Sequence, residues 1–158
     1  MSARCWIVIG AGSCLLAQPA GAADYVSKVM TRDLSVPADL AWKRIGSFCA
    51  LDKFIAVTCR YSVGIGDVPT VRVGSKGGEE VMVARTPLSY TYASRNSPLF
   101  YHATMAVEAT GTKTSRLIYT FVWDQESLSP DARTKDAEFR ERIFAPALDK
   151  AKAVAESR

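Results

Sequence analysis

The chain has 158 residues, of which 48% are hydrophobic and 23% are charged, a composition typical of one globular domain with a buried core. This composition excludes a disordered tail, a collagen-like fibre and a multidomain protein. Basic residues number 20 and acidic residues 16, and no long run of like charges occurs, which argues against nucleic-acid binding. The single histidine, His102, excludes a multi-histidine metal centre, and we expect no metal or other cofactor.

The first 22 residues have the layout of a secretory signal peptide. Arg4 supplies a positive charge, an apolar run extends from Cys5 to Ala17, and Ala20-Gly21-Ala22 provides the small residues of a cleavage site. The run is shorter than the roughly 20 residues of a membrane-spanning helix, so we expect no stable membrane anchor. We therefore expect cleavage near Ala22, with Ala23 as the alternative, export to the periplasm, and one domain over residues 23–158.

Removal of this leader leaves two cysteines, Cys49 and Cys59. In an oxidising compartment they can form a disulfide, and the alternative is that each is buried separately as a small apolar side chain. The sequence leaves both interpretations open. Cys14, within the leader, follows small residues as in a lipidation site, but the apolar residues after it argue against a lipid anchor.

The remaining chain predicts one strand, two short helices, six strands and a long helix. We expect the first strand over Tyr25–Val36, a helix from Pro37 to Gly46, and a second short helix over Cys49–Ile55. Apolar runs separated by turn residues then predict strands at residues 57–63, 70–73, 79–85, 89–94, 101–108 and 115–125. Tight turns between these runs require a mostly antiparallel sheet.

Helical spacing of apolar residues begins after Ser129-Pro130-Asp131. We expect Arg140 on the solvated face of this last helix. Its apolar face is expected to comprise Phe139, Ile143, Ala147, Leu148, Ala151, Val154 and Ala155.

The order of these elements and several short motifs carry a resemblance to a known family. Ser35–Trp42 resembles the "pad-x-vW" opening of the SRPBCC (START/Bet v 1-like) superfamily, especially its polyketide cyclase/dehydrase-like branch. Further similar fragments are Ile45–Phe48, Ala50–Phe54, Val71-Arg72, Ser89–Tyr92 and Tyr101–Met105. The resemblance spans residues 26–156 and implies an α+β helix-grip fold. In this fold a seven-stranded antiparallel sheet wraps around a long C-terminal helix, with two short helices after the first strand.

Two departures from the family pattern weaken the transfer of a specific catalytic role. Pro69 precedes the "vR" step where the family usually has a nearby glycine, and Val81-Met82-Val83 replaces the usual acidic residue of the fourth strand. Glu79 and Glu80 lie just upstream of that replacement.

The resemblance implies a ligand cavity between the sheet and the last helix. Strand alternation also gathers tyrosines on one face of the sheet, where aromatic walls with hydroxyl groups suit a lipid or an aromatic metabolite. The alternative is that these side chains simply fill a core. The expected lining residues are Arg72, Tyr90, Tyr92, Tyr101, Met105, Tyr119, Phe121, Trp123, Phe139, Ile143 and Leu148. Arg72 or Arg85 could bind a ligand carboxylate or phosphate if it points inward, and otherwise is a solvated strand residue.

No nucleophile motif, phosphate-binding loop, metal-ligand cluster or paired carboxylates occur in the sequence. We therefore expect a non-enzymatic periplasmic protein that binds a hydrophobic small molecule. One alternative is a polyketide cyclase/dehydratase-like enzyme that uses tyrosine and arginine side chains. Another is an accessory protein of a periplasmic oxidation system, because secreted members of the branch include accessory proteins of periplasmic methanol oxidation. A protein partner therefore stays open.

Overall fold

A computed structural model describes residues 23–157 of the chain. The expected signal peptide over residues 1–22 lies outside the described residues. The elements, in chain order, are β1 (Tyr25–Leu34), α1 (Ala38–Ile45), the 3-10 helix η1 (Ala50–Lys53), β2 (Cys59–Val63), β3 (Val71–Gly74), β4 (Glu79–Thr86), β5 (Ser89–Ser94), β6 (His102–Ala109), β7 (Ser115–Asp124) and α2 (Pro130–Glu156).

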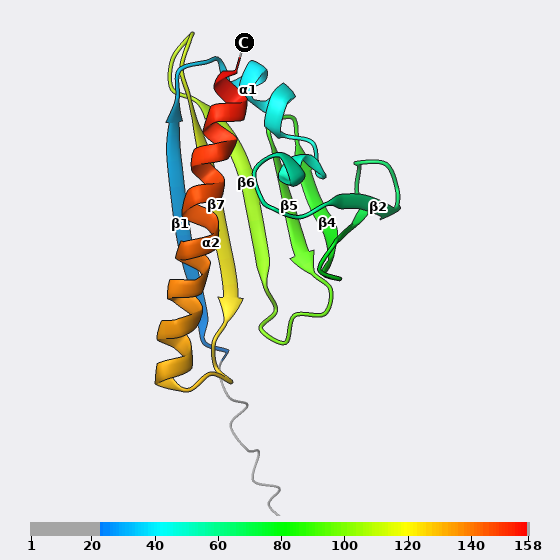
Figure 1. Cartoon of the computed structure of the whole chain (residues 1–158), viewed down its shortest axis with the longest axis vertical. Helices are drawn as coiled ribbons and strands as arrows, with labels where there is room; N and C mark the ends of the chain where they lie inside the picture. The colour runs from blue at the N-terminus through cyan, green and yellow to red at the C-terminus, as the bar shows by residue number, and fades with distance from the viewer. Residues whose placement is uncertain (1–22, 158) are drawn as a thin grey trace, which may run out of the picture.

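The strands form one seven-stranded antiparallel sheet in the order β1-β7-β6-β5-β4-β3-β2. Each of the strands β2 to β7 pairs with its neighbour in sequence, as tight turns require, and β1 closes the far edge by pairing with β7. The long helix α2 runs along the β1–β7 half of the sheet, α1 packs beside the C-terminal end of α2, and η1 lies on the side of β2 (Figure 1). This arrangement confirms the expected α+β helix-grip fold.

Several boundaries differ from the sequence expectation by one or more residues, and two of these differences have a local reason. β1 ends at Leu34 rather than Val36, since the backbone N–H of Ser35 donates to the Glu156 side chain instead of to the sheet. The second short helix is a single 3-10 turn over Ala50–Lys53. β2 begins at Cys59 rather than Val57, because the Val57 N–H is used in a local turn with the Ile55 carbonyl.

The core lies between the concave face of the sheet and α2. Alternating residues of β7 point inward, and register pairs Met105 on β6 with Tyr119 on β7. Small residues let α2 approach this face closely, and its buried positions are Ala147, Leu148, Ala151 and Ala155. In Figure 1, α2 does not cover the β3–β5 half of the sheet. The cavity described below is lined by residues of these strands.

The N-terminal half of α2 presents a different face from the one expected. Phe139 is 51% exposed, and the partly buried residue in its place is Phe144, whose ring centroid lies 4.5 Å from that of Phe121. Arg140, which was expected in solvent, instead packs against the sheet, with its guanidinium carbon 4.3 Å from the Trp123 ring centroid. Residues 140, 144, 147 and 148 are spaced by three and four positions, so they share one face once Phe144 is turned inward.

Candidate functional site

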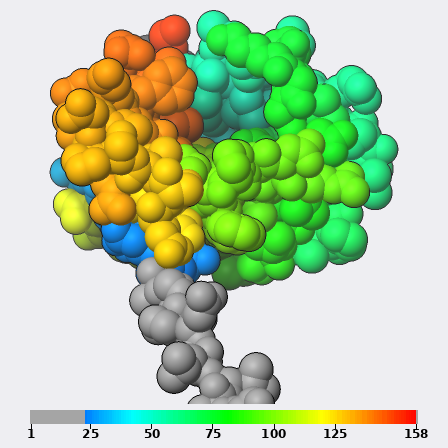
Figure 2. Space-filling model, turned by 90° about the horizontal axis from the view of Figure 1, so that it is seen from below, coloured from blue at the N-terminus to red at the C-terminus, as the bar shows by residue number. Residues whose placement is uncertain are grey.

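A cavity of about 200 Å³ lies between η1, strands β3 to β5, and α2. Seen from below, the molecule is hollowed between α2, in orange, and the cyan and green segments of the other half (Figure 2). A narrow apolar extension of about 10 Å³ continues beneath α2, lined by residues that include Met105, Tyr119 and Leu148. The site is therefore a compact chamber between the sheet and the helices.

The walls of this chamber divide into an apolar part and a polar part. The apolar wall comes from the η1 segment and α2, and consists of Leu51, Phe54, Ile55, Val57, Ile143 and Phe144. The polar wall comes from the sheet, and its side chains are Arg72, Lys76, Glu80, Tyr90, Tyr92 and Tyr119. A molecule in the chamber would meet aliphatic and aromatic side chains on one side and hydrogen-bonding groups on the other.

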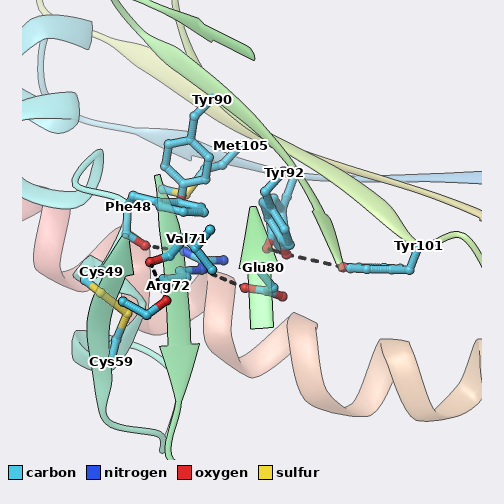
Figure 3. Close-up of polar contacts among 12 residues, drawn as sticks. Phe48, Cys49, Cys59, Val71, Arg72, Glu80, Tyr90, Tyr92, Tyr101 and Met105 are labelled. Carbon is cyan, nitrogen blue, oxygen red and sulfur yellow. Dashed lines mark hydrogen bonds and ion pairs between the residues drawn. A yellow bond between two sulfur atoms is a disulfide. The ribbon is translucent and has the colours of Figure 1, made fainter. Parts of the chain in front are cut away.

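Arg72, on β3, is the central group of the polar wall and is only 3% exposed. Its Nε donates to Glu80 Oε2 over 2.6 Å, and its Nη1 donates to the Phe48 carbonyl (Figure 3). The guanidinium carbon lies 4.1 Å from the Phe48 ring centroid and 4.6 Å from that of Tyr92. Aromatic rings therefore hold the guanidinium in place through cation–π contacts, and the two hydrogen bonds use two of its five N–H groups.

The charge of this arginine is retained despite its burial. Desolvation opposes the charged form, but the nearby Tyr90 oxygen and the Glu80 carboxylate outweigh it and raise the pKa of Arg72 above its usual value. Register explains the pairing, since Arg72 and Glu80 lie directly opposite each other on β3 and β4. The hairpin between the two strands thus places a paired positive and negative charge at the cavity.

Three tyrosine hydroxyl groups form a short chain next to this pair. The Tyr92 hydroxyl lies 2.5 Å from that of Tyr119. It also lies 3.4 Å from the Tyr101 hydroxyl (Figure 3). The three hydroxyls carry three donor protons, and the two hydrogen bonds between them use two. One O–H of the three is therefore left to donate to another group. Nearby, Tyr90 donates to the Met105 sulfur over 3.2 Å, and a thioether is a weak acceptor.

These four phenols are neutral hydrogen-bonding groups. Burial raises the pKa of Tyr90, Tyr92, Tyr101 and Tyr119, because the phenolate would lose its hydration. The positive charge of Arg72 opposes this effect without cancelling it. Near neutral pH the tyrosines therefore offer O–H donors and lone pairs, and no phenolate.

A disulfide holds the η1 wall of the cavity at both ends. The Cys49 and Cys59 sulfurs are bonded, with Cα atoms 5.4 Å apart, so the two cysteines are not buried separately. Between them, the η1 backbone makes mainly local hydrogen bonds, such as that from Ile55 N–H to the Leu51 carbonyl. Cys59 itself lines the cavity. The disulfide therefore keeps a weakly tied wall against the sheet.

The structure brings only part of the expected set to the cavity. The chamber is lined by Arg72, Tyr90, Tyr92, Tyr119 and, at its rim, Ile143. Met105 and Leu148 line the apolar extension.

Four expected lining residues do not reach the chamber. Tyr101 contacts it only through the Tyr92 hydroxyl, and Phe121 lies behind Tyr119 and Phe144. Trp123 packs under Arg140, and Phe139 is exposed on α2. Tyr101, Phe121 and Trp123 lie on the expected face of the sheet, but the chamber occupies one end of that face and the core fills the rest.

Sequence reasoning missed two contributions to the site. The sequence predicts a short helix at η1 but no role for it in the site, although Leu51, Phe54 and Ile55 have the spacing of one apolar helix face. The family pattern places the acidic residue of the fourth strand within Val81-Met82-Val83 and gives no role to Glu80, just upstream. The turn Gly77-Gly78 between two strands could have identified it as the cross-strand partner of Arg72.

The other candidates lie away from the cavity. Arg85 forms an exposed ion pair with Asp67, and His102 is exposed on the face of the sheet opposite the core. Within residues 23–157, no group of three His, Cys, Asp or Glu side chains is placed to hold a metal ion. No helix in this described part is long and apolar enough to cross a membrane.

A family model matches this chain over residues 26–156, and its description is polyketide cyclase / dehydrase and lipid transport. The chain belongs to this family. The match supports the SRPBCC resemblance. The comparison with curated proteins found no match.

Solved structures share the fold at low sequence identity. A Nitrosospira multiformis protein is 18% identical, with a TM-score of 0.67 over 84% of this chain and 97% of its own. A Thermobifida fusca protein is also 18% identical, with a TM-score of 0.67 over 80% of this chain and 90% of its own. Ara h 8.0201 is 14% identical, with a TM-score of 0.63 over 83% of this chain and 97% of its own. These similarities establish the fold alone.

Proposed function

We propose that this family member is a binding protein that holds a small, ring-containing molecule in the chamber between the sheet and α2. The observation that carries the proposal is a cavity of about 200 Å³ with one apolar wall and one wall of buried hydrogen-bonding groups. Ligand sites commonly combine a mostly apolar lining with a few placed polar groups.

The size of the chamber limits the ligand. A cavity of about 150 Å³ lined by apolar side chains accommodates benzene. A volume of about 200 Å³ therefore suits one substituted ring or a short acyl chain. A sterol or a two-chain lipid would have to extend through the opening beside Ile143.

Binding can be tested with a pair of tryptophan variants on α2. Ile143→Trp places a large ring at the cavity rim, whereas Phe139→Trp adds similar bulk on an exposed position of the same helix. We expect native mass spectrometry and titration calorimetry to detect a small aromatic ligand in the wild type and in Phe139→Trp. Ile143→Trp should bind it at least about tenfold more weakly. Equal binding by both variants would place the ligand elsewhere.

The proposal also includes a cellular location. We propose that the protein is exported and acts in the periplasm. The signal-like sequence of residues 1–22 and the Cys49–Cys59 disulfide support this location, since disulfides persist in oxidising compartments. A role as an accessory protein of a periplasmic oxidation system stays a prediction.

A second candidate function is a cyclase or dehydratase activity. The specific observation in its favour is that Glu80, a carboxylate, and the neutral Tyr92–Tyr119 pair line the same cavity. A carbonyl polarised by a tyrosine O–H could lose a neighbouring proton to the carboxylate. This candidate requires turnover of a polyketone-type substrate that falls at least about tenfold in Tyr119→Phe. Ligand binding without turnover supports the first proposal.

A further inference from the structure

The polar wall of the chamber contains one tightly paired set of charges. Arg72 and Glu80 are joined over 2.6 Å, so the cavity has no strong net charge at its inner end. Lys76, the remaining charged lining residue, lies on the exposed rim, where water screens it. The electrostatics of this site therefore favour a ligand without net charge.

The Glu80 carboxylate disfavours the binding of a ligand carboxylate at Arg72. To bind Arg72 it would have to lie beside the Glu80 carboxylate, and like charges in a partly desolvated site repel each other. An ammonium group would meet Arg72 in the same way. The buried ion pair thus selects against both signs of charge.

The same wall offers hydrogen bonds that no described protein group uses. Glu80 accepts one bond from Arg72, and a carboxylate has about four acceptor positions. The hydroxyls of Tyr101, Tyr92 and Tyr119 have one O–H left over, and when Tyr101 donates to Tyr92 this O–H belongs to Tyr92 or Tyr119, which line the cavity. A ligand hydroxyl can donate to the first group and accept from the second.

From these contacts, and resting on the proposed function, we infer that the ligand is an uncharged hydroxylated aromatic molecule of about one ring. Its hydroxyl lies against Glu80 and the tyrosine pair, and its ring lies against the η1 wall of Leu51, Phe54 and Ile55. A hydrocarbon of the same size would leave the polar wall desolvated without new partners, which costs affinity.

Four probes of similar size test this inference at neutral pH: 4-methylphenol, p-xylene, 4-methylbenzoate and 4-methylbenzylammonium. Affinities are measured by calorimetry, and binding in the chamber is checked by chemical shifts of Ile55 and Val57. We expect 4-methylphenol to bind at least about tenfold tighter than each of the other three. Tighter or equal binding of p-xylene or of 4-methylbenzoate would overturn the inference and leave the proposed function intact. Absence of binding by all four would instead contradict the proposed function.

A charge-neutralising variant sharpens the test. Glu80→Gln keeps the side-chain size and leaves the positive charge of Arg72 unbalanced, so the affinity for 4-methylbenzoate relative to 4-methylphenol should rise about tenfold. Glu79→Gln is the matched control, because the Glu79 carboxylate is next to Glu80 in sequence, pairs with Arg95 and does not line the cavity. An unchanged preference in a folded Glu80→Gln would contradict the inference. If that variant does not fold, the order of the four probes in the wild type decides.

Discussion

Arg72 on β3 and Phe48, in the segment between α1 and η1, are joined in two ways. The guanidinium donates a hydrogen bond to the Phe48 carbonyl, and it also lies 4.1 Å from the centroid of the Phe48 ring. Phe48 directly precedes Cys49, which begins the disulfide-bonded wall of the cavity. One buried side chain therefore ties the sheet to the segment that encloses the candidate ligand site.

Loss of this arginine should destabilise the whole domain. We expect Arg72→Met to lower the free energy of unfolding by about 3 kcal/mol, because Glu80 and the Phe48 carbonyl both lose their partner. Urea unfolding followed by circular dichroism measures the change. The control is Arg85→Met, which removes an exposed pair with Asp67 and should cost less than about 1 kcal/mol. Similar losses in the two variants would contradict the structural role of Arg72.

The disulfide should stabilise both the fold and the cavity wall. The two cysteines are 10 residues apart, and cross-linking a loop of this length contributes about 2–3 kcal/mol by the chain-entropy model. The double variant Cys49→Ser, Cys59→Ser should therefore unfold at lower urea concentration. Reductant should destabilise the wild type by a similar amount and leave the double variant unchanged. A reductant effect on the double variant would point to a cause other than this disulfide.

Two phenylalanines of α2 should respond very differently to truncation. Phe144 packs against Tyr119 and Phe121, so Phe144→Ala should lower the free energy of unfolding by about 2–3 kcal/mol and enlarge the chamber. Phe139 is 51% exposed, so Phe139→Ala should change the free energy of unfolding by about 0.5 kcal/mol or less. Thermal unfolding of the two variants measures the difference. A larger loss of stability in Phe139→Ala than in Phe144→Ala would contradict the structure and support the helix face predicted from the sequence, with Phe139 inside.

Four of the six tyrosines should resist ionisation in the folded protein. Burial raises the pKa of Tyr90, Tyr92, Tyr101 and Tyr119. Above pH 10, near the ordinary tyrosine pKa, the unfolded chain releases these protons while the folded chain keeps them. Stability is therefore fully present below this pH and falls as the pH rises above it. Absorbance titration at alkaline pH should show these four phenolates forming only together with unfolding, and their reversible ionisation in folded protein would contradict their burial.

Export can be tested by expression of the full sequence in a bacterium. We expect the protein recovered from the periplasm to begin at Ala23, or at Asp24 if the alternative cleavage site is used. N-terminal sequencing and the intact mass identify the site. Replacing Leu15 and Leu16 with lysine interrupts the apolar run and should retain the uncleaved protein inside the cell. Periplasmic recovery of that variant would contradict the signal peptide.

The helix-grip fold could be predicted from the sequence because its signals are local. Turn residues such as Gly77-Gly78 separate runs with strand alternation, and Pro130 opens a stretch with helical spacing. Short turns then force neighbouring strands to pair in antiparallel order. Local patterning also placed Tyr90, Tyr92 and Tyr119 on one face of the sheet, where the structure has them.

The candidate site depended on contacts between segments that are distant in sequence. Only the packing of α2 turned Phe144 inward and left Phe139 exposed, since both positions fit an apolar helix face. The burial of Arg72 required the Phe48 segment to fold over it, and the open question of Cys49 and Cys59 was decided by the same fold. The periodicity of apolar residues assigns a side chain to one face of a helix or strand. A cavity, however, exists only where the helix and the sheet do not pack against each other. Sequence therefore determined the layers of this protein, and the tertiary structure decided where between them a ligand has room.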